Sequence, residues 1–305
     1  MMRKKIDVAV IGAGIAGLSA GIYLKRSSVT SLLIEKAAPG GKLLTIHAID
    51  NYPSEILISG PALAEKAVAH AASLGVEIAY GNVLSLTKGN GLFLIVTDLE
   101  QIEAKAVIVA TGTLTKTLGV PGEKEFAGRG VSYCATCDGN FFKGKDVAVV
   151  GSKDQAVEEA IYLADLVRHL YFFAPTDIES PDNHLKALKS FPNVEIIEKA
   201  ALEAIKGDKL VSAVAVVVDG KAADYPVSGV FPLSGERSSS DFLAALSPRN
   251  RNGFLDVDFD MKTSIEGLFA AGDVVNRKLR QIVTASSDGA VAATSAIAYV
   301  HSLAK

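Results

Sequence analysis

The two cysteines of the 305-residue sequence stand at positions 134 and 137, in the string CATCDG. Cysteines at this spacing can form a disulfide without backbone rearrangement. A thiol in such a motif often has a lowered pKa, so that reactive thiolate exists near neutral pH. The pattern therefore favours dithiol/disulfide chemistry at Cys134 and Cys137. The alternatives are a buried pair of small residues and half of a zinc site. A structural zinc site needs four ligands, and the five histidines show no paired metal spacing, so no metal is predicted.

A second motif, the string GAGIAG at positions 12–17, lies between an apolar, β-branched stretch at 6–11 and a stretch of helical periodicity at 15–26. In a GxGxxG loop the first glycine makes the tight turn, the second lets the backbone approach a diphosphate, and the third allows close helix packing. The diphosphate then lies at the positive end of the helix. Glu35 ends the next predicted strand, where it can accept a hydrogen bond from a ribose hydroxyl. Strand, helix and acidic residue together favour a dinucleotide site over a simple glycine-rich turn.

The elements that must position these motifs occur in two similar halves. A predicted strand at 145–150 is followed by a second glycine loop, a helix at 155–166 and a strand at 169–173. A last strand at 268–271 and a small-residue helix at 284–301 then return to the first half. We therefore expect an α/β fold of two Rossmann-like three-layer nucleotide-binding domains, the first discontinuous. Residues 1–114 and 242–305 form the first domain, and 115–241 form the inserted, cysteine-bearing domain.

Composition narrows the function classes. A net charge of −3 and a pI near 6.0 give no electrostatic footprint for nucleic acid. No run of about 18 uncharged apolar residues exists, so no membrane span is predicted. Basic residues at 3–5 before an apolar run imitate a signal peptide, but Asp7 interrupts that run. Two cysteines in the chain favour a reducing compartment, and the expected location is the cytoplasm.

Taken together, several strings resemble the low-molecular-weight thioredoxin reductase family of flavoprotein disulfide reductases. They are GAGIAG at 12–17, GGKL at 40–43, NYP at 51–53, ATG at 110–112, CATCDG at 134–139, Thr263, GLFAAGD at 267–273 and RQ at 280–281. They occur in the family's order along nearly the whole chain. The resemblance implies bound FAD, a homodimer, and a disulfide that alternates between the flavin and a partner protein.

The resemblance also assigns residues to roles. It implies that Cys137 is the flavin-proximal cysteine and that Asp138 manages the thiol protons. Lys42 stands where the family usually has glutamine, so its contact with the flavin is expected to differ. Asp273 suits a hydrogen bond to a ribityl hydroxyl, although alone it also fits an ordinary turn. The expected FAD-binding residues are Gly12, Gly14, Ile15, Ala16, Gly17, Glu35, Lys36, Gly41, Lys42, Leu43, Asn51, Val83, Ala110, Thr111, Gly112, Gly272, Asp273, Arg280, Gln281 and Ile282.

The second glycine loop departs from the family's pattern. The family has GxGxxA there, whereas this chain has GSKDQA at 151–156, with Lys153 at the second glycine position. The family follows the next strand with a basic HRR-type cluster that pairs with the 2′-phosphate of NADPH. This chain has FAPTDIE at 173–179, with no arginine or lysine, and Asp177 and Glu179 would repel a phosphate. The inserted domain therefore resembles a degenerate NADPH-binding domain.

These features predict an FAD-dependent enzyme that reduces thioredoxin, or a thioredoxin-like protein, through Cys134 and Cys137. The electron donor is predicted to be something other than NADPH, with ferredoxin as the candidate. In this respect the chain resembles family members that lack the NADPH motifs, such as flavin-type ferredoxin:thioredoxin reductases. Two alternatives stay open: an NAD(P)H-dependent thioredoxin reductase with an altered nucleotide site, and a flavin-bound redox sensor with little turnover.

Overall fold

The computed structural model describes residues 4–46, 48–246, 249–250 and 253–303, and the chain divides into two compact units. Unit 1 comprises Met1–Leu114 and Arg237–Lys305, and unit 2 comprises Thr115–Glu236. The strands β7 (Thr113–Thr115) and β15 (Glu236–Ser238), which lie at the two chain crossings, pair with each other. The second crossing lies five residues before the boundary expected after residue 241. Residues 237–241 belong to unit 1, where Ser239 donates to the Gly112 carbonyl at 3.2 Å and Ser240 to the Gly253 carbonyl at 3.1 Å.

Unit 1 is built on a mixed sheet with the strand order β3-β2-β1-β6-β5-β4, in which β16 also pairs with β6. The pairs among β3, β2, β1, β6 and β16 are parallel, whereas β4, β5 and the start of β6 are antiparallel. The carboxyl ends of β1, β2, β6 and β16 therefore lie at one edge of the sheet. The strands are β1 (Lys4–Ile11), β2 (Ser31–Glu35), β3 (Ile78–Tyr80), β4 (Val83–Gly89), β5 (Leu92–Thr97), β6 (Gln101–Val109) and β16 (Leu268–Ala270).

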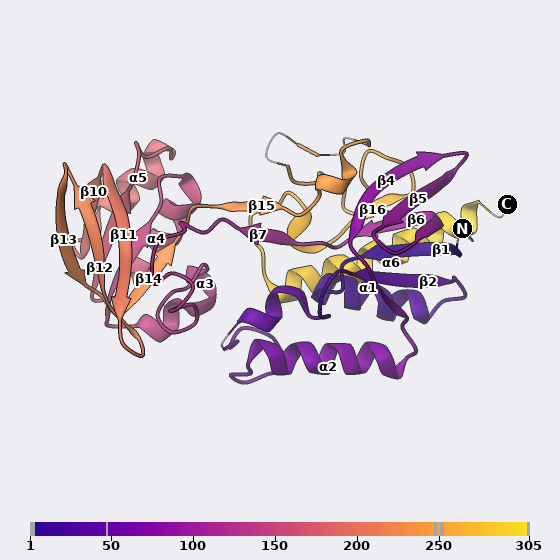
Figure 1. The fold of residues 1–305 in the computed structure, drawn as a ribbon, viewed down its shortest axis with the longest axis horizontal. Helices are drawn as coiled ribbons and strands as arrows, with labels where there is room; N and C mark the ends of the chain where they lie inside the picture. Colours follow the sequence, from indigo (N-terminus) through magenta and orange to yellow (C-terminus); the bar gives the residue numbers. More distant parts are fainter. Residues whose placement is uncertain (1–3, 47, 247–248, 251–252, 304–305) are drawn as a thin grey trace. The chain divides into compact units, whose positions relative to one another are not determined.

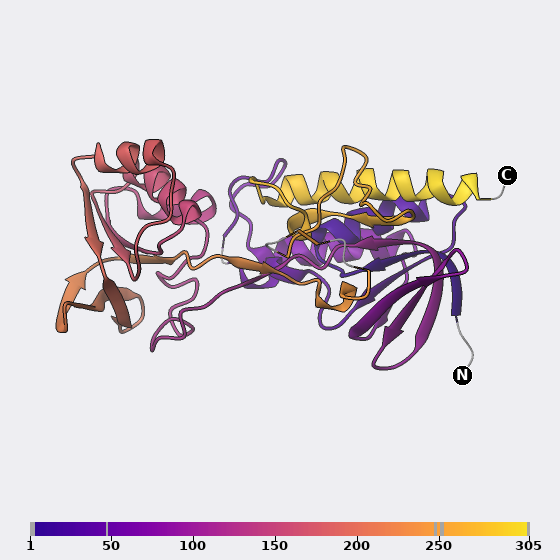
Figure 2. The ribbon, with the colours of Figure 1, turned by 90° about the horizontal axis from the view of Figure 1, so that it is seen from above.

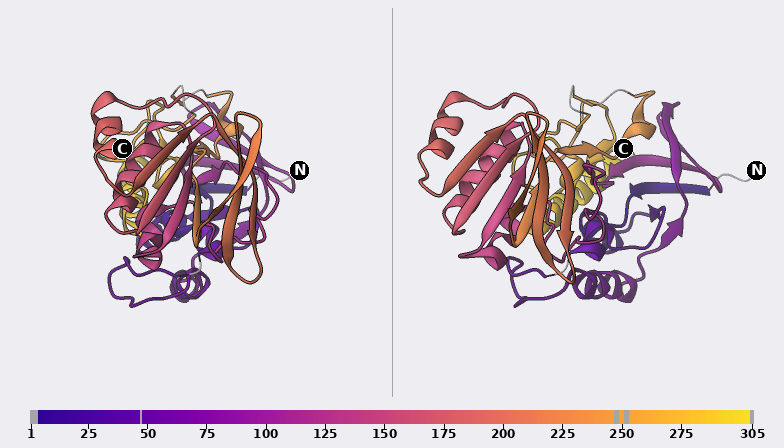
Figure 3. Two further views of the ribbon diagram at one scale, coloured as in Figure 1. Left: turned by 90° about the vertical axis from the view of Figure 1, so that its left-hand side faces the viewer. Right: turned by 60° about the vertical axis from the view of Figure 1, so that its left-hand side comes forward.

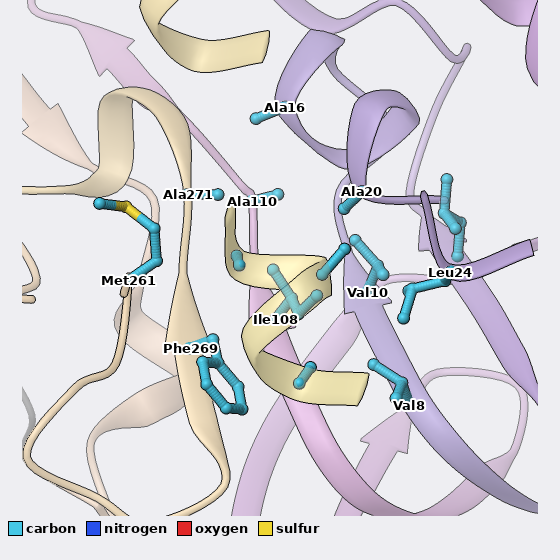
Figure 4. Close-up of a cluster of buried hydrophobic side chains, with 14 of the residues drawn as sticks. Val8, Val10, Ala16, Ala20, Leu24, Ile108, Ala110, Met261, Phe269 and Ala271 are labelled. Carbon is cyan, nitrogen blue, oxygen red and sulfur yellow. The ribbon is translucent and has the colours of Figure 1, made fainter. Parts of the chain in front are cut away.

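Helices α1 (Ile15–Lys25) and α6 (Ile282–Ser302) cover one face of this sheet, and α2 (Gly60–Ser73) packs against α1 (Figures 1 and 2). The sheet and α1 share a core of small and branched side chains, which Figure 4 shows: Val8, Val10, Ile108 and Phe269 of the strands and Ala16, Ala20 and Leu24 of α1. A Cβ atom added at Gly289 would lie 2.1 Å from the Ala16 carbonyl oxygen, so the backbones of α6 and α1 are in direct contact. Leu243 and Leu255 pack with β4 and β5 on the other face.

Unit 2 has three layers. Its parallel sheet has the order β10-β9-β8-β14, and α4 and α5 pack on one face of it. An antiparallel sheet of β11, β12 and β13, the three neighbouring orange strands of Figure 3, supplies the layer on the other face. The bounds are β8 (Asp146–Val150), β9 (His169–Ala174), β10 (Val194–Glu198), β11 (Ala200–Gly207), β12 (Val211–Val218), β13 (Lys221–Pro226), β14 (Gly229–Pro232), α3 (Ala135–Asp138), α4 (Asp154–Ala164) and α5 (Asp182–Lys189).

The two-domain α/β architecture is confirmed, with Rossmann-like sheets of mixed strand direction. Strand β6 is long because its first residues, 101–104, form antiparallel pairs with β5, while residues 102–109 pair in parallel with β1. In the part of the chain that the structure describes, no helix is long and apolar enough to cross a membrane.

Candidate functional site

Two of the three glycines of the first loop, Gly12 and Gly17, leave no room for a side chain. Gly12 follows β1 with a φ of +104°, and a Cβ there would lie 2.5 Å from the Ala110 carbonyl oxygen. A Cβ at Gly17 would lie 1.8 Å from the Gly12 carbonyl oxygen. Because glycine has no Cβ, α1 can pack this closely against the turn. Gly14 is the N-cap of α1 and offers no side chain to that helix end. The N-terminal amides of α1 therefore face a position that only a ligand or solvent can fill.

Glu35 ends β2 as predicted, and the structure adds a second role for it. Its side chain is buried, with Oε2 accepting a hydrogen bond of 2.7 Å from the Ala13 amide and Oε1 one of 2.9 Å from the Ala37 amide. The carboxylate thus holds the glycine loop in place and links it to the segment after β2. Each oxygen has a further lone pair, so the predicted bond to a ribose hydroxyl remains compatible with this geometry.

A second glycine pair meets the first. Gly40 donates its amide to the Ala13 carbonyl at 2.8 Å, and a Cβ at Gly41 would lie 3.1 Å from the Gly14 Cα. Gly41 begins the short 3₁₀ helix η1 (Gly41–Thr45). The next residue, Lys42, reaches across the site. Its Nζ lies 2.5 Å from the Thr113 hydroxyl and 3.5 Å from Asp273 Oδ2.

Thr111, after the end of β6, carries an unsatisfied polar atom. Its Oγ1 is buried without a hydrogen-bond partner, the single such side-chain atom in the described part of the chain. A buried hydroxyl without a partner is costly. This hydroxyl belongs to the ATG string at 110–112, which neighbours the glycine loop through Ala110. The site therefore contains a group that a polar ligand would satisfy.

The C-terminal part of unit 1 completes this edge of the sheet. Asp273 lies in the 3₁₀ helix η4 (Gly272–Val274), and the Gly272 amide donates to Asp288 Oδ2 at 3.1 Å. Asp288 is buried, and Arg277 Nη1 pairs with its other oxygen at 2.6 Å. Burial raises the pKa of Asp288, and the Arg277 guanidinium opposes that rise. Asp288 is not among the FAD-binding residues expected from the sequence.

The N-terminus of α6 is closely tied to the site. Gln281 is the N-cap and forms a capping box with Thr284, and its Oε1 accepts a hydrogen bond of 3.1 Å from Asn51 Nδ2. Arg280 donates from Nε to the Asp273 carbonyl at 3.3 Å and stacks over Phe254, 4.4 Å from the ring centroid. Residues 230 positions apart in the sequence are thereby joined, and the positive end of a long helix is fixed beside them.

The structure thus brings the expected FAD-binding residues together around the ends of β1, β2, β6 and β16. The others take these places: Ile15 and Ala16 in the first turn of α1, Lys36 after β2, Leu43 in η1, Gly112 after Thr111, Val83 at the start of β4, and Ile282 at the start of α6. The glycine cradle and the unsatisfied Thr111 hydroxyl both fit FAD. Two side chains were not expected here, Thr113 and Asp288.

In unit 2, Cys134 and Cys137 form a disulfide with a Cα–Cα distance of 5.3 Å. Cys134 is the N-cap of α3, and its Sγ accepts a hydrogen bond of 3.2 Å from the Cys137 amide. The Thr136 hydroxyl lies 3.4 Å from the same sulfur. Asp138 ends α3, and its amide donates to the Cys134 carbonyl at 3.2 Å. Cys134 is half-buried and already surrounded by hydrogen-bond donors that suit a thiolate.

A carboxylate that the motif did not predict lies at this centre. Glu159, on α4, accepts a hydrogen bond of 2.7 Å from the Ala135 amide through Oε2, and Gln155 Nε2 donates to its Oε1 at 3.0 Å. The helix α4 packs against α3, which turns this residue toward the disulfide helix. Helical periodicity at 155–166 could have indicated the face that Glu159 occupies, but not its partner.

The second glycine loop, in unit 2, is hydrogen-bonded to the segment that follows β9. The segment after β9 folds back onto it: the Glu179 amide donates to the Ser152 carbonyl at 2.7 Å, and the Thr176 amide donates to the Ser152 hydroxyl at 3.1 Å. Lys153, at the second glycine position, is the N-cap of α4, and its side chain is exposed. A side chain therefore stands where the family's loop has none.

The first turn of α4 carries Asp154, whose carboxylate is held by the same returning segment. Asp154 Oδ1 accepts from the Ser180 hydroxyl at 2.7 Å and lies 2.8 Å from His184 Nδ1. Glu158 lies 4.0 Å from the same histidine nitrogen. The potential ligand atoms of these two acids and His184 fall within 4.8 Å of one another, a grouping that histidine spacing did not reveal. Negative side chains thus occupy the helix end that usually receives a diphosphate.

A family model described as pyridine nucleotide-disulphide oxidoreductase matches residues 6–289. The thioredoxin reductase of Bacillus subtilis (strain 168) is 39% identical over 309 residues, which cover 99% of this chain and 98% of that protein. The crystal structure of thioredoxin reductase from Streptococcus pyogenes MGAS5005 has a TM-score of 0.94 at 37% identity, covering 99% and 100% of the two chains. A ferredoxin-flavin thioredoxin reductase from Clostridium acetobutylicum has a TM-score of 0.56 at 30% identity and covers 99% of each chain.

Proposed function

Because this chain belongs to the pyridine nucleotide-disulphide oxidoreductase family, we propose that it reduces the disulfide of thioredoxin, or a thioredoxin-like protein, with electrons from a donor other than NADPH. It is a flavin disulfide oxidoreductase of the thioredoxin reductase type, and its cofactor is FAD. Relatives named thioredoxin reductase and relatives named ferredoxin-flavin thioredoxin reductase cover the chain equally fully. The donor is therefore argued from the residues of unit 2.

The output chemistry rests on Cys134 and Cys137. One thiolate of the reduced pair attacks a sulfur of the partner's disulfide, so that a mixed disulfide forms and the partner's other sulfur leaves as a thiolate. The second cysteine then attacks the mixed disulfide, which restores the Cys134–Cys137 bond and releases the reduced partner. The enzyme pair loses two electrons and the partner gains two. We assign Asp138 to the proton transfers that accompany these steps, because it lies next to Cys137.

We propose that unit 1 holds the FAD. The amides of the two glycine loops and of the α1 N-terminus would bind the diphosphate, Glu35 the ribose, and Asp273 the ribityl chain. Lys42, Asn51 and the α6 N-terminus would face the ring system. When bound, a flavin accepts electrons singly or in pairs and passes two to a disulfide. The orphaned Thr111 hydroxyl supports this assignment.

A single observation supports the donor proposal: an acidic side chain in the first turn of α4 is held there by hydrogen bonds from the segment after β9. Asp154 lies in the first turn of α4, where a diphosphate would otherwise bind, and its carboxylate is bonded to Ser180 and His184. Ala174 and Pro175, at the end of β9, stand where the family has the basic pair that would hold a 2′-phosphate. Charge-assisted phosphate contacts are thus lost and repulsion is added. A ferredoxin, which supplies one electron at a time, is the donor we propose.

The test is an anaerobic flavin-bleaching assay. The purified holoenzyme is mixed in turn with NADPH, NADH and chemically reduced ferredoxin, and the loss of flavin absorbance is followed. Oxidised thioredoxin is then added, and its new thiols are counted. We expect ferredoxin to bleach the flavin and produce about one dithiol per two electrons. Rapid bleaching by micromolar NADPH or NADH would overturn the donor proposal and favour a pyridine-nucleotide enzyme with an altered site.

The same assay addresses the redox-sensor alternative. If ferredoxin bleaches the flavin but thioredoxin thiols never exceed the amount of enzyme, the protein does not turn over. We further propose that the working form is a homodimer in the cytoplasm. The two cysteines of the chain support a reducing compartment. Sedimentation of the holoenzyme as a monomer would contradict the homodimer.

A further inference from the structure

The disulfide helix of unit 2 has an acidic residue at its N-terminal end. Glu159 Oε2 accepts the Ala135 amide at 2.7 Å, and Ala135 directly follows Cys134. Gln155, one turn earlier on α4, donates to the other carboxylate oxygen at 3.0 Å and so fixes its orientation. Ala135 is fully buried, so this hydrogen bond is shielded from competition by water. The carboxylate is therefore a fixed feature of the environment of Cys134.

The position of this charge determines its effect. Cys134 Sγ accepts a hydrogen bond from the Cys137 amide and has the Thr136 hydroxyl 3.4 Å away, and both donors favour a negative sulfur. The Glu159 carboxylate, bonded to the amide of the residue next to Cys134, places a like charge near the sulfur and opposes its negative form. The disulfide carries no charge, so the carboxylate does not change its stability in this way. Glu159 therefore acts on the reduced form alone.

We propose that Glu159, held in place by Gln155, destabilises the reduced Cys134–Cys137 pair relative to the disulfide and so makes the pair a stronger reductant. This inference rests on the redox role assigned above to the two cysteines. A disulfide protein whose reduced form is stabilised is a strong oxidant, and Glu159 works in the opposite sense. It is a positioning residue, since it reaches the reacting sulfur only through the field and the backbone.

The test measures the equilibrium between the enzyme disulfide plus two glutathione molecules and the enzyme dithiol plus glutathione disulfide. The oxidised flavoprotein is equilibrated anaerobically in glutathione buffers, trapped with iodoacetamide and analysed by mass. Glu159→Gln removes the charge and keeps an acceptor for the Ala135 amide, and Gln155 can rotate its own amide to match. At pH 8.5 we expect the equilibrium constant for reduction to rise roughly three- to tenfold in this variant.

Glu158→Gln is the matched control, because Glu158 is the neighbouring carboxylate on the same helix and lies beside His184 rather than Ala135. It should leave the constant unchanged within twofold. Gln155→Leu, which releases the carboxylate from its fixed orientation, should shift the constant in the same direction as Glu159→Gln but by less. Each variant is first checked for unchanged flavin content and thermal unfolding.

The pH dependence separates a charge effect from a structural one. Above the thiol pKa of the wild type, the equilibrium constants for reduction of Glu159→Gln and wild type differ by the full amount. Well below the thiol pKa of the variant both proteins are fully protonated and the constants converge. The other ionisable groups on α3, on α4 and just before Cys134 are Asp138, Asp154, Glu158, Tyr162 and Tyr133. Burial raises the pKa of Tyr133, so it stays neutral over this range.

An equilibrium constant in Glu159→Gln equal to that of the Glu158→Gln control at pH 8.5 would overturn the proposal. So would a shift of the same size at pH 6, since that would reflect packing. The measurement needs neither an electron donor nor thioredoxin. A failure of the proposed function therefore appears in the bleaching and thioredoxin assays, whereas a failure of this inference appears only here.

Discussion

Glu123 offers the sharpest test of how unit 2 supports its disulfide. This carboxylate is 1% exposed and accepts three hydrogen bonds: from the Leu118 amide at 3.1 Å, the Gly119 amide at 2.7 Å and the Tyr133 hydroxyl at 3.1 Å. Tyr133 directly precedes Cys134. Burial, followed by the charge of Glu123, raises the pKa of Tyr133, so its hydroxyl remains a donor at neutral pH. Glu123 thus clamps the segment that leads into the disulfide.

Replacing Glu123 by alanine leaves buried donors without partners. A buried donor that loses its acceptor costs about 1–3 kcal/mol. With two buried amides affected, and the Tyr133 hydroxyl free to rotate toward solvent, we expect Glu123→Ala to destabilise unit 2 by about 3–5 kcal/mol. Glu123→Gln keeps one acceptor and should cost about 1–3 kcal/mol.

The assay is urea denaturation of the oxidised protein, followed by far-UV circular dichroism. Glu125→Ala is the control, because Glu125 is an exposed acid two positions along the same segment, and such changes usually stay within about 0.5 kcal/mol. The order of unfolding midpoints should be Glu123→Ala lowest, then Glu123→Gln, then control and wild type together. If Glu123→Ala unfolds at the same urea concentration as the control, the reasoning from buried hydrogen bonds is refuted.

Three further predictions address the cofactor, the cysteines and pH. Gly17→Ala should abolish FAD retention, seen as a lost flavin absorbance band, because the added methyl would lie 1.8 Å from a backbone oxygen of the same loop. Cys134→Ser and Cys137→Ser should each abolish thioredoxin reduction while the protein keeps its flavin colour, and activity in both variants would contradict the dithiol route. The hydrogen-bonded Arg168 lowers the pKa of Asp146, so this pair stabilises the fold above pH 3.8 and its contribution fades as pH falls through the lower folded pKa. The free energy of unfolding of Asp146→Asn should therefore be lower than that of the wild type at pH 7, and the two values should converge below that pKa.

The chain's local patterns predicted the sheets and glycine loops well, because each depends on a few neighbouring residues. A strand followed by GxGxxG and a helix specifies the turn at Gly12 almost alone, and the acidic residue after β2 was expected at Glu35. The bonds of Glu35 to Ala13 and Ala37 were not foreseen. A sequence shows which acid ends a strand, but the backbone amides that reach it depend on how the loops pack.

Contacts between distant segments account for most of what sequence reasoning missed. Lys42 and Asp273 are 231 positions apart, and their ion pair follows from the meeting of η1 with η4. Glu123 lies in a polar stretch and Glu159 follows the exposed Glu158 on α4, and the local sequence does not name the amides that these two acids accept. Their burial or pairing arises from the packing of neighbouring segments onto the disulfide helix. The second domain crossing lies before its expected position for the same reason, since Ser239 and Ser240 donate hydrogen bonds to residues of unit 1.

The pairing of β16 with β6, and the backbone contact of Gly289 with Ala16, have a consequence for biosynthesis. On the ribosome, unit 2 emerges as one uninterrupted segment and can fold while the rest is still being made. Unit 1 folds later, since β16 and α6 are translated after unit 2. A nascent chain therefore acquires its disulfide-bearing part first, and the complete flavin site can form only once α6 has left the ribosome.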